Sequence, residues 1–243
     1  MGLLEIHSVS KSFGGIHALH DCSLTVEQGT VTGLIGPNGS GKTTLFNVVT
    51  GYDRIDTGEI RFDGKIISGE TPASIFSLGL GRTFQLTRIF PRLTVLENMH
   101  VALPRNVRGL LRHWGSSQEQ HQALDLLEFV SLTRLKDEPA GNLSYGQKKL
   151  LEFALILVAG PQIILLDEPA GGVNPTMVNE LARMIRTLNE DKHITFLVVE
   201  HNMEFVMGLC HTVNVMHRGT TIASGAPDLV RKDPVVLDAY LGA

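Results

Sequence analysis

The chain has few cysteines, and their spacing limits what they can do. Only 2 of its 243 residues are cysteine, and Cys22 and Cys210 lie far apart with no C-x-x-C pattern. This arrangement excludes a disulfide framework and a zinc site, and it favours buried thiols in a reduced compartment. We expect apolar packing alone to hold the core, since a chain of this length can bury a substantial one.

A long hydrophobic run, a targeting signal and an excess of basic residues are also lacking. The most apolar stretch, residues 154–166, is too short to span a bilayer and is interrupted by Gly160 and Pro161. Residues 1–6 carry neither a basic region nor an apolar core, and Ile6 breaks the myristoylation pattern. The net charge of −4 argues against a general nucleic-acid surface. Any membrane role therefore requires a separate membrane partner.

What the sequence does contain is a phosphate-binding pattern. Residues 36–44 read GPNGSGKTT and fit G-x-x-x-x-G-K-[ST]. Glycines let backbone N–H groups point inward, Lys42 can reach the β and γ phosphates, and the Thr43 hydroxyl can ligate Mg²⁺. A buried strand is expected before the loop and a helix after it, which distinguishes it from an ordinary glycine-rich turn. The predicted nucleotide contacts are Gly36, Asn38, Gly39, Ser40, Gly41, Lys42, Thr43 and Thr44.

Hydrophobic patterns predict an α/β fold with a mostly parallel sheet. Residues 4–8 and 24–26 alternate apolar and polar side chains, which is typical of antiparallel strands. Residues 163–167 and 194–200 read as buried strands, and residues 175–189 read as a helix whose methionines and leucines face the core. Helices that alternate with strands in this way cover the faces of a parallel sheet.

Two shorter features leave alternatives open. Phe13 is expected in a loop next to glycines, where it can stack on adenine or simply pack as an ordinary aromatic. Six arginines and one acid, Glu97, occur over residues 82–112, in a segment that proline and glycine interrupt. Solvated or partner-facing arginine is favoured there over a nucleic-acid patch. The arginines are Arg82, Arg88, Arg92, Arg105, Arg108 and Arg112.

Paired acids end the predicted strand at 163–167. Asp167 and Glu168 come at its carboxyl end, where open α/β sheets bind ligands. Asp167 can hold Mg²⁺ through water, and Glu168 can take a proton from an attacking water. A purely structural cap is less favoured, because adjacent carboxylates after an apolar strand cost free energy unless a cation offsets them.

Residues 143–147 read LSYGQ and open a predicted long helix. Ser144 and Gln147 form a capping box by themselves, which needs no ligand. Gly146 is left unexplained, since glycine is a poor helix residue, but it would allow a phosphate to approach the helix N-terminus.

Together these segments resemble the ATP-binding subunits of ABC transporters. The resemblance rests on the phosphate loop, Gln85, residues 143–147, the paired acids and His201, in that order. It implies a P-loop NTPase fold of ABC type, in which a mostly parallel core sheet carries an N-terminal antiparallel β subdomain and an inserted helical subdomain. The implied single domain spans residues 1–243, with residues 1–85 and 161–243 in the core and 86–160 in the helical subdomain.

The resemblance also implies roles for single residues. Gln85 would reach Mg²⁺ and the attacking water, His201 would contact the γ-phosphate, and Phe13 would stack on adenine. Two copies, or two related chains, would sandwich two ATP molecules head to tail. The implied catalytic set is Glu168, His201, Gln85 and Lys42. The implied metal contacts are Thr43, Gln85 and Asp167, and Ser144, Gly146 and Gln147 would contact the nucleotide of the other subunit.

Two positions depart from the family pattern. Tyr145 stands where glycine is usual, and Asn174 stands where aspartate is usual, although it still caps the helix that follows. These departures put communication between the two ATP sites in doubt and leave open a nucleotide-switched dimerisation module with little hydrolysis. Tyr145 and Asn174, together with residues 81–90 and 239–242, most resemble the importer ATPases for branched-chain amino acids. Importer ATPases for urea and amides have similar residues in these segments.

The sequence thus predicts an ATPase that energises solute import. The expected cofactors are ATP and Mg²⁺, and the expected partners are a second ATPase subunit, membrane permease subunits and an extracytoplasmic solute-binding protein, with no nucleic acid. The expected place is the cytoplasmic face of the plasma membrane, bound peripherally. The alternative is a lipid-exporter-type subunit, which would share the same catalytic residues.

Overall fold

The computed structural model describes residues 2–83, 89–103 and 117–241. Gln85, Arg88, Arg105, Arg108 and Arg112 lie outside the described residues. Two sheets are built from these strands: β1 Gly2–Phe13, β2 Ile16–Glu27, β3 Val31–Ile35, β4 Thr57–Phe62, β5 Lys65–Ile66, β6 Leu80–Arg82, β7 Ile163–Asp167, β8 Thr195–Val199, β9 Thr212–His217 and β10 Thr220–Gly225.

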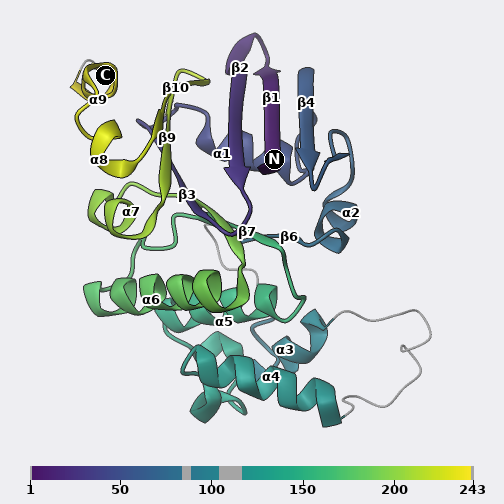
Figure 1. Ribbon diagram of the computed structural model, residues 1–243. Helices are drawn as coiled ribbons and strands as arrows, with labels where there is room; N and C mark the ends of the chain where they lie inside the picture. The colour runs from purple at the N-terminus through teal and green to yellow at the C-terminus, as the bar shows by residue number, and fades with distance from the viewer. Residues whose placement is uncertain (1, 84–88, 104–116, 242–243) are drawn as a thin grey trace.

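Helices connect and cover the strands (Figure 1). The α-helices are α1 Lys42–Val49, α2 Pro72–Ser77, α3 Val95–Ala102, α4 Ser117–Phe129, α5 Tyr145–Leu157, α6 Pro175–Lys192, α7 Met203–Leu209, α8 Pro227–Val230 and α9 Pro234–Leu241, with 3₁₀ turns η2 Thr133–Leu135 and η3 Ala140–Asn142. Among the described residues, each helix is too short or too polar to cross a membrane.

The larger sheet has six strands in the order β10-β9-β3-β8-β7-β6. Its inner strands run parallel, and only the β9–β10 hairpin is antiparallel. The smaller sheet, in the order β2-β1-β4-β5, is antiparallel throughout. The prediction of a mostly parallel core sheet with an N-terminal antiparallel part is therefore confirmed.

The parallel sheet separates two hydrophobic cores. Along β7, Ile163 and Leu165 belong to the core shared with α1 and the antiparallel sheet, whereas Ile164 and Leu166 belong to the core shared with the helices on the opposite face. This alternation follows from the two-residue period of a strand. Figure 1 shows the layers, with β1, β2 and β4 on one side and α5 and α6 on the other.

Helices fill most of the described chain between β6 and β7. α3 and α4 pack with α5 below the sheet (Figure 1), and their apolar residues join the same core as α6. These elements fall within the range predicted for a helical subdomain, residues 86–160. The division of the chain into a core and an inserted subdomain stays a prediction.

Two expectations about local structure need correction. Phe13 is the last residue of β1 rather than a loop residue, because its backbone pairs with Ile16 as the first two strands extend to a tight hairpin. Arg82 is not a solvated arginine, because its guanidinium is buried against Asp167. By contrast, the buried stripe on α6 is confirmed, and both thiols are free and buried.

Candidate functional site

The phosphate loop joins β3 to α1 and is shaped by glycine. Gly41, the residue before α1, has a φ of 103°, a left-handed conformation that glycine adopts at little cost. A Cβ there would lie only 2.5 Å from the Ala18 carbonyl oxygen. A Cβ on Gly36 would overlap the Met216 carbonyl. The loop therefore curls tightly only because these two positions lack side chains.

Lys42 fills the inside of this curl. Its side chain is buried, and its ammonium donates hydrogen bonds to the Gly36 and Pro37 carbonyl oxygens at 2.8 and 2.9 Å. Burial lowers the pKa of Lys42, while the charges of Glu168 and Asp167 act in the opposite sense. The ammonium is thus held at the position that an anionic ligand would reach.

A cavity of about 270 Å³ opens over the loop. It brings together nine of the predicted site residues and three residues of β2 that sequence reasoning missed, Ile16, His17 and Ala18. The predicted residues are Asn38, Gly39, Ser40, Gly41, Lys42, Thr43, Thr44, Glu168 and His201. These residues of β2 belong to no sequence motif, so only the pairing of β2 with β1 could have indicated that they line the cavity.

Glu168 and His201 meet across this cavity. Each follows the end of a parallel strand, β7 for Glu168 and β8 for His201, and the strands are neighbours. The Glu168 Oε1 and His201 Nε2 atoms lie 3.0 Å apart. The carboxylate is thereby oriented by a hydrogen bond, as a general base needs to be.

Asp167 belongs to a buried polar network. Its Oδ2 accepts a hydrogen bond from Arg82 at 2.9 Å, and its backbone N–H donates to the Thr83 hydroxyl at 3.1 Å. The side chains of Arg82 and Asp167 are only 6% and 4% exposed. Arg82 is therefore the cation that offsets one of the paired acids, and it was wrongly grouped with solvent-facing arginines.

Glu200 is a second residue that the sequence did not single out. It is buried, and its carboxylate accepts hydrogen bonds from the backbone N–H groups of Ala170, His201 and Asn202 at 2.6, 2.9 and 3.1 Å. Backbone donors of this kind stabilise a buried carboxylate. Glu200 therefore ties the loop after Glu168 to the loop that carries His201.

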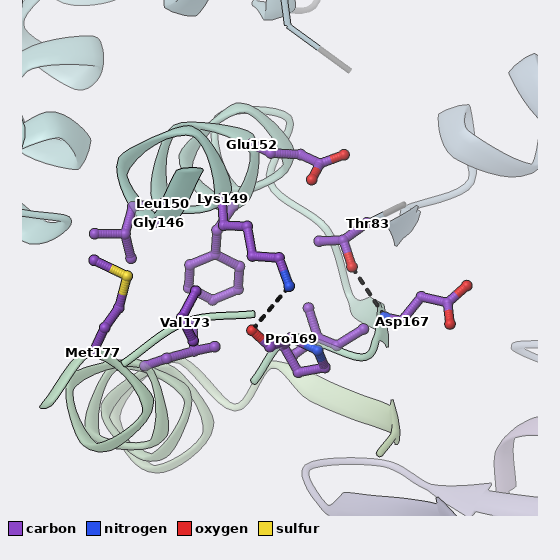
Figure 2. Close-up of a pocket in the computed structure, with 12 residues that line it drawn as sticks. Thr83, Gly146, Lys149, Leu150, Glu152, Asp167, Pro169, Val173 and Met177 are labelled. Atoms are coloured by element: carbon purple, nitrogen blue, oxygen red, sulfur yellow. Dashed lines mark hydrogen bonds between the residues drawn. The ribbon is translucent and has the colours of Figure 1, made fainter. Parts of the chain in front are cut away.

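The segment Ser144 to Gln147 does not line the phosphate-loop cavity. Ser144 is the N-cap of α5, and it exchanges hydrogen bonds with Gln147 in a complete capping box. Packing within this chain accounts for the glycine at position 146, because a Cβ there would overlap the Met177 side chain on α6. Gly146 lines a second, smaller cavity between α5, α6 and β7 (Figure 2).

Phe13 is likewise absent from the residues that line the phosphate-loop cavity. Phe13 is 45% exposed, and the centre of its ring lies 5.0 Å from the Lys11 ammonium. Ile16, which pairs with Phe13 across the hairpin and is 74% exposed, lines the cavity instead. Ile16 and Phe13 therefore offer an apolar surface for a nucleobase at the β1–β2 hairpin, and Ile16 lies nearer the cavity than Phe13.

The site has few protein ligands for a metal ion. Among the described residues, three or more acidic, histidine or cysteine side chains do not gather in any one place. Mg²⁺ fits such a site, because it keeps several waters and binds through one or two protein groups together with substrate phosphates. Thr43 borders the cavity, Asp167 is the last residue of β7, and Gln85 lies outside the described residues.

Comparison with known proteins agrees with this arrangement. Residues 19–171 match the family described as ABC transporter, and residues 220–243 match the family described as branched-chain amino acid ATP-binding cassette transporter. The solved structure of a nucleotide-free ATP-binding cassette from an ABC transporter superposes with a TM-score of 0.88 at 35% identity, over 100% of both chains. A cassette solved in its ADP conformation gives the same values.

Curated relatives are similar over nearly their whole length. The high-affinity branched-chain amino acid transport ATP-binding protein BraF of Pseudomonas aeruginosa is 37% identical, over 99% of this chain and 98% of its own. The probable branched-chain amino acid transport ATP-binding protein LivG of Archaeoglobus fulgidus is 38% identical, over 100% and 96%. The predicted resemblance and fold class are confirmed, and the chain belongs to the ABC transporter family as an ATP-binding, ATP-hydrolysing cassette.

Proposed function

We propose that this cassette powers the import of branched-chain amino acids. The observation that carries the proposal is the Glu168–His201 pair, 3.0 Å apart, beside the buried Lys42 ammonium in one cavity. The choice of solute rests on the names of the relatives BraF and LivG. It rests also on the match of residues 220–243 to a branched-chain amino acid family.

In the proposed mechanism the phosphate loop binds the β and γ phosphates. The Lys42 ammonium exchanges the Gly36 and Pro37 carbonyls for phosphate oxygens, and backbone N–H groups at the start of α1 add to the positive potential. Thr43, Gln85 and, through water, Asp167 would hold Mg²⁺, which would offset negative charge on the phosphates when bound. Nucleotide binding therefore relies mainly on loop residues 36–44.

Glu168 is the proposed general base. Its carboxylate borders the cavity and can take a proton from a water that attacks the γ-phosphoryl group. His201 bonds the carboxylate and would help to orient that water at the γ-phosphate. Ile16 and Phe13 are proposed to flank the adenine.

Ser144, Gly146 and Gln147 are proposed to complete the site of a second subunit. They open α5 on a surface apart from the phosphate-loop cavity, and a helix N-terminus attracts phosphate. The second subunit is a second copy or a related cassette, joined head to tail by ATP.

Further partners follow from the proposed transport role. Permease subunits would hold the cassette peripherally at the cytoplasmic face of the plasma membrane, and an extracytoplasmic solute-binding protein would deliver the solute. Nucleic acid has no part in this scheme. Arg92, which is exposed, is a candidate contact with the permease.

The proposal is tested in two steps. Purified chain is assayed for Mg²⁺-ATP turnover, and then the complex purified from native membranes is reconstituted in vesicles and assayed for ATP-dependent uptake of labelled leucine and urea. We expect turnover in the first assay and leucine uptake in the second. Uptake of urea but not leucine would reject the proposed solute while leaving the ATPase intact.

A further inference from the structure

Lys149 makes an unusual set of contacts in the second turn of α5. Its ammonium donates hydrogen bonds to the carbonyl oxygens of Glu168, Pro169 and Gly171 at 2.9, 3.4 and 2.8 Å. A lysine ammonium has three protons to donate, so one cation serves three carbonyls of one short loop. Figure 2 shows the side chain running from α5 to the loop at Pro169.

The loop that Lys149 binds begins with a strained residue. Glu168 has a φ of 49°, which is uncommon for a residue other than glycine and persists only where the surroundings fix it. Its carbonyl oxygen also accepts the Gly171 N–H at 3.1 Å. The hydrogen bond from Lys149 to the Glu168 carbonyl therefore stabilises the backbone conformation that directs the Glu168 carboxylate toward His201.

The other end of the contact lies at the start of α5. The Lys149 ammonium lies 5.2 Å from the centre of the Tyr145 ring, and this ring lies so close to Gly172 that a Cβ there would be 3.1 Å from Cε1. The N-terminus of α5 and the loop after Glu168 are thus packed against each other through Tyr145 as well as through Lys149. Tyr145, a departure from the family pattern, adds to this link.

Two opposing effects act on the pKa of the Lys149 ammonium. Burial lowers the pKa of its ammonium, and neighbouring carboxylates, Glu200 first, oppose that effect. A neutral side chain of the same length would leave carbonyl oxygens without their donor, which costs free energy in a part-buried place.

We propose that Lys149 is a positioning residue that fixes the backbone of Glu168 to the N-terminus of α5. The inference rests on the proposed function, in which that N-terminus meets the nucleotide of the second subunit while Glu168 acts on the cassette's own nucleotide. Binding of the second subunit's nucleotide at the N-terminus of α5 would then change, through Lys149, the position of the general base Glu168 at the cassette's own nucleotide. Nucleotide affinity is little affected, because the Lys42 loop has its own hydrogen bonds.

The test compares Lys149→Met and Lys149→Arg with Lys148→Met as the matched control. In the full chain, Lys149→Met is expected to lower the kcat for Mg²⁺-ATP about 10- to 100-fold, with the KM for ATP within about twofold of wild type. Lys149→Arg, whose guanidinium can still donate to several carbonyls, is expected to restore part of the kcat, and Lys148→Met to change little.

A second readout follows the loop itself. In a Glu168→Gln background, Mg²⁺-ATP is expected to slow amide hydrogen exchange over residues 168–172 as the dimer closes. Adding Lys149→Met should leave the dimer in size-exclusion chromatography but abolish this protection. If Lys149→Met does not fold, Lys149→Gln takes its place in both assays.

A kcat within about twofold of wild type in the neutral variants, or unchanged protection of residues 168–172, overturns the inference. So does an equal loss of kcat and of nucleotide affinity, which would indicate a general structural role. A wild-type chain that fails to turn over ATP would instead reject the proposed function.

Discussion

Arg82 and Asp167 form a buried ion pair that joins three parts of the site. The guanidinium donates to Asp167 Oδ2 at 2.9 Å from one nitrogen, and to Asn47 Oδ1 and Thr50 Oγ1 of the α1 region at 2.8 and 3.0 Å from another. It also lies 5.4 Å from the centre of the Phe46 ring. The acid proposed to reach the metal is therefore tied to the phosphate-binding helix.

Replacing Arg82 by methionine should destabilise the fold strongly. Removing one partner of a buried pair leaves an uncompensated charge, and the expected loss in free energy of unfolding is about 3 to 5 kcal/mol. Urea unfolding followed by circular dichroism measures it. Arg61→Met is the control, because its 2.6 Å pair with Glu59 is about one third exposed and should contribute less than about 1 kcal/mol. Equal losses for the two variants would contradict the role given to Arg82.

Glu168→Gln should separate binding from hydrolysis. Glutamine keeps the size of the side chain and a hydrogen bond to His201 but cannot take a proton, so turnover should fall by roughly 10² to 10⁴. The dissociation constant for a fluorescent ATP analogue should stay near the wild-type value. Wild-type turnover in this variant would mean that another group acts as the base.

Lys42→Ala and Ser144→Arg should fail at different steps. The first removes the buried ammonium of the phosphate loop, so it should abolish nucleotide binding in a direct binding assay. The second places a bulky cation at the exposed start of α5 and should spare binding by the monomer but prevent the ATP-dependent dimer in size-exclusion chromatography. Dimer formation by Ser144→Arg would remove Ser144 from the proposed interface.

The Cys210 thiol should make the fold sensitive to alkali. Burial raises its pKa from 9.0 to about 12, so the folded state keeps a proton that the unfolded state loses. The native state binds more protons between these values, and the free energy of unfolding should fall as pH rises from 9 to 12, by up to about 1.4 kcal/mol per pH unit. Urea unfolding of wild type and Cys210→Ala over this range should show a shallower slope in the variant. Identical slopes would show that the thiol does not contribute.

Sequence patterns identified the parts of this site whose chemistry is local. The phosphate loop, the paired acids and the capping box at Ser144 each lie within a few consecutive residues, and the structure has them on the expected elements. His201, which the family resemblance indicated, follows the strand predicted at 194–200, and parallel pairing of β7 and β8 brings it to Glu168.

The residues that were missed act across long separations. Arg82 reaches Asp167 through the pairing of β6 with β7, and Glu200 holds the loop at Ala170. An arginine in a basic stretch and a lone acid before a histidine carry no local pattern that distinguishes them from solvated residues. Ile16 was missed because only the hairpin register reveals which of two neighbouring apolar residues faces the cavity.

The division of β7 between two cores also limits how this protein can change over evolution. Removing or inserting one residue in β7 would exchange the side chains of its two faces and would turn Asp167 and Glu168 away from Arg82 and His201 in the same step. The same alternation of side chains along this strand therefore sets both the core packing and the catalytic geometry. Natural length variation should avoid residues 163–168 and collect in the connections between elements, where extra residues are tolerated.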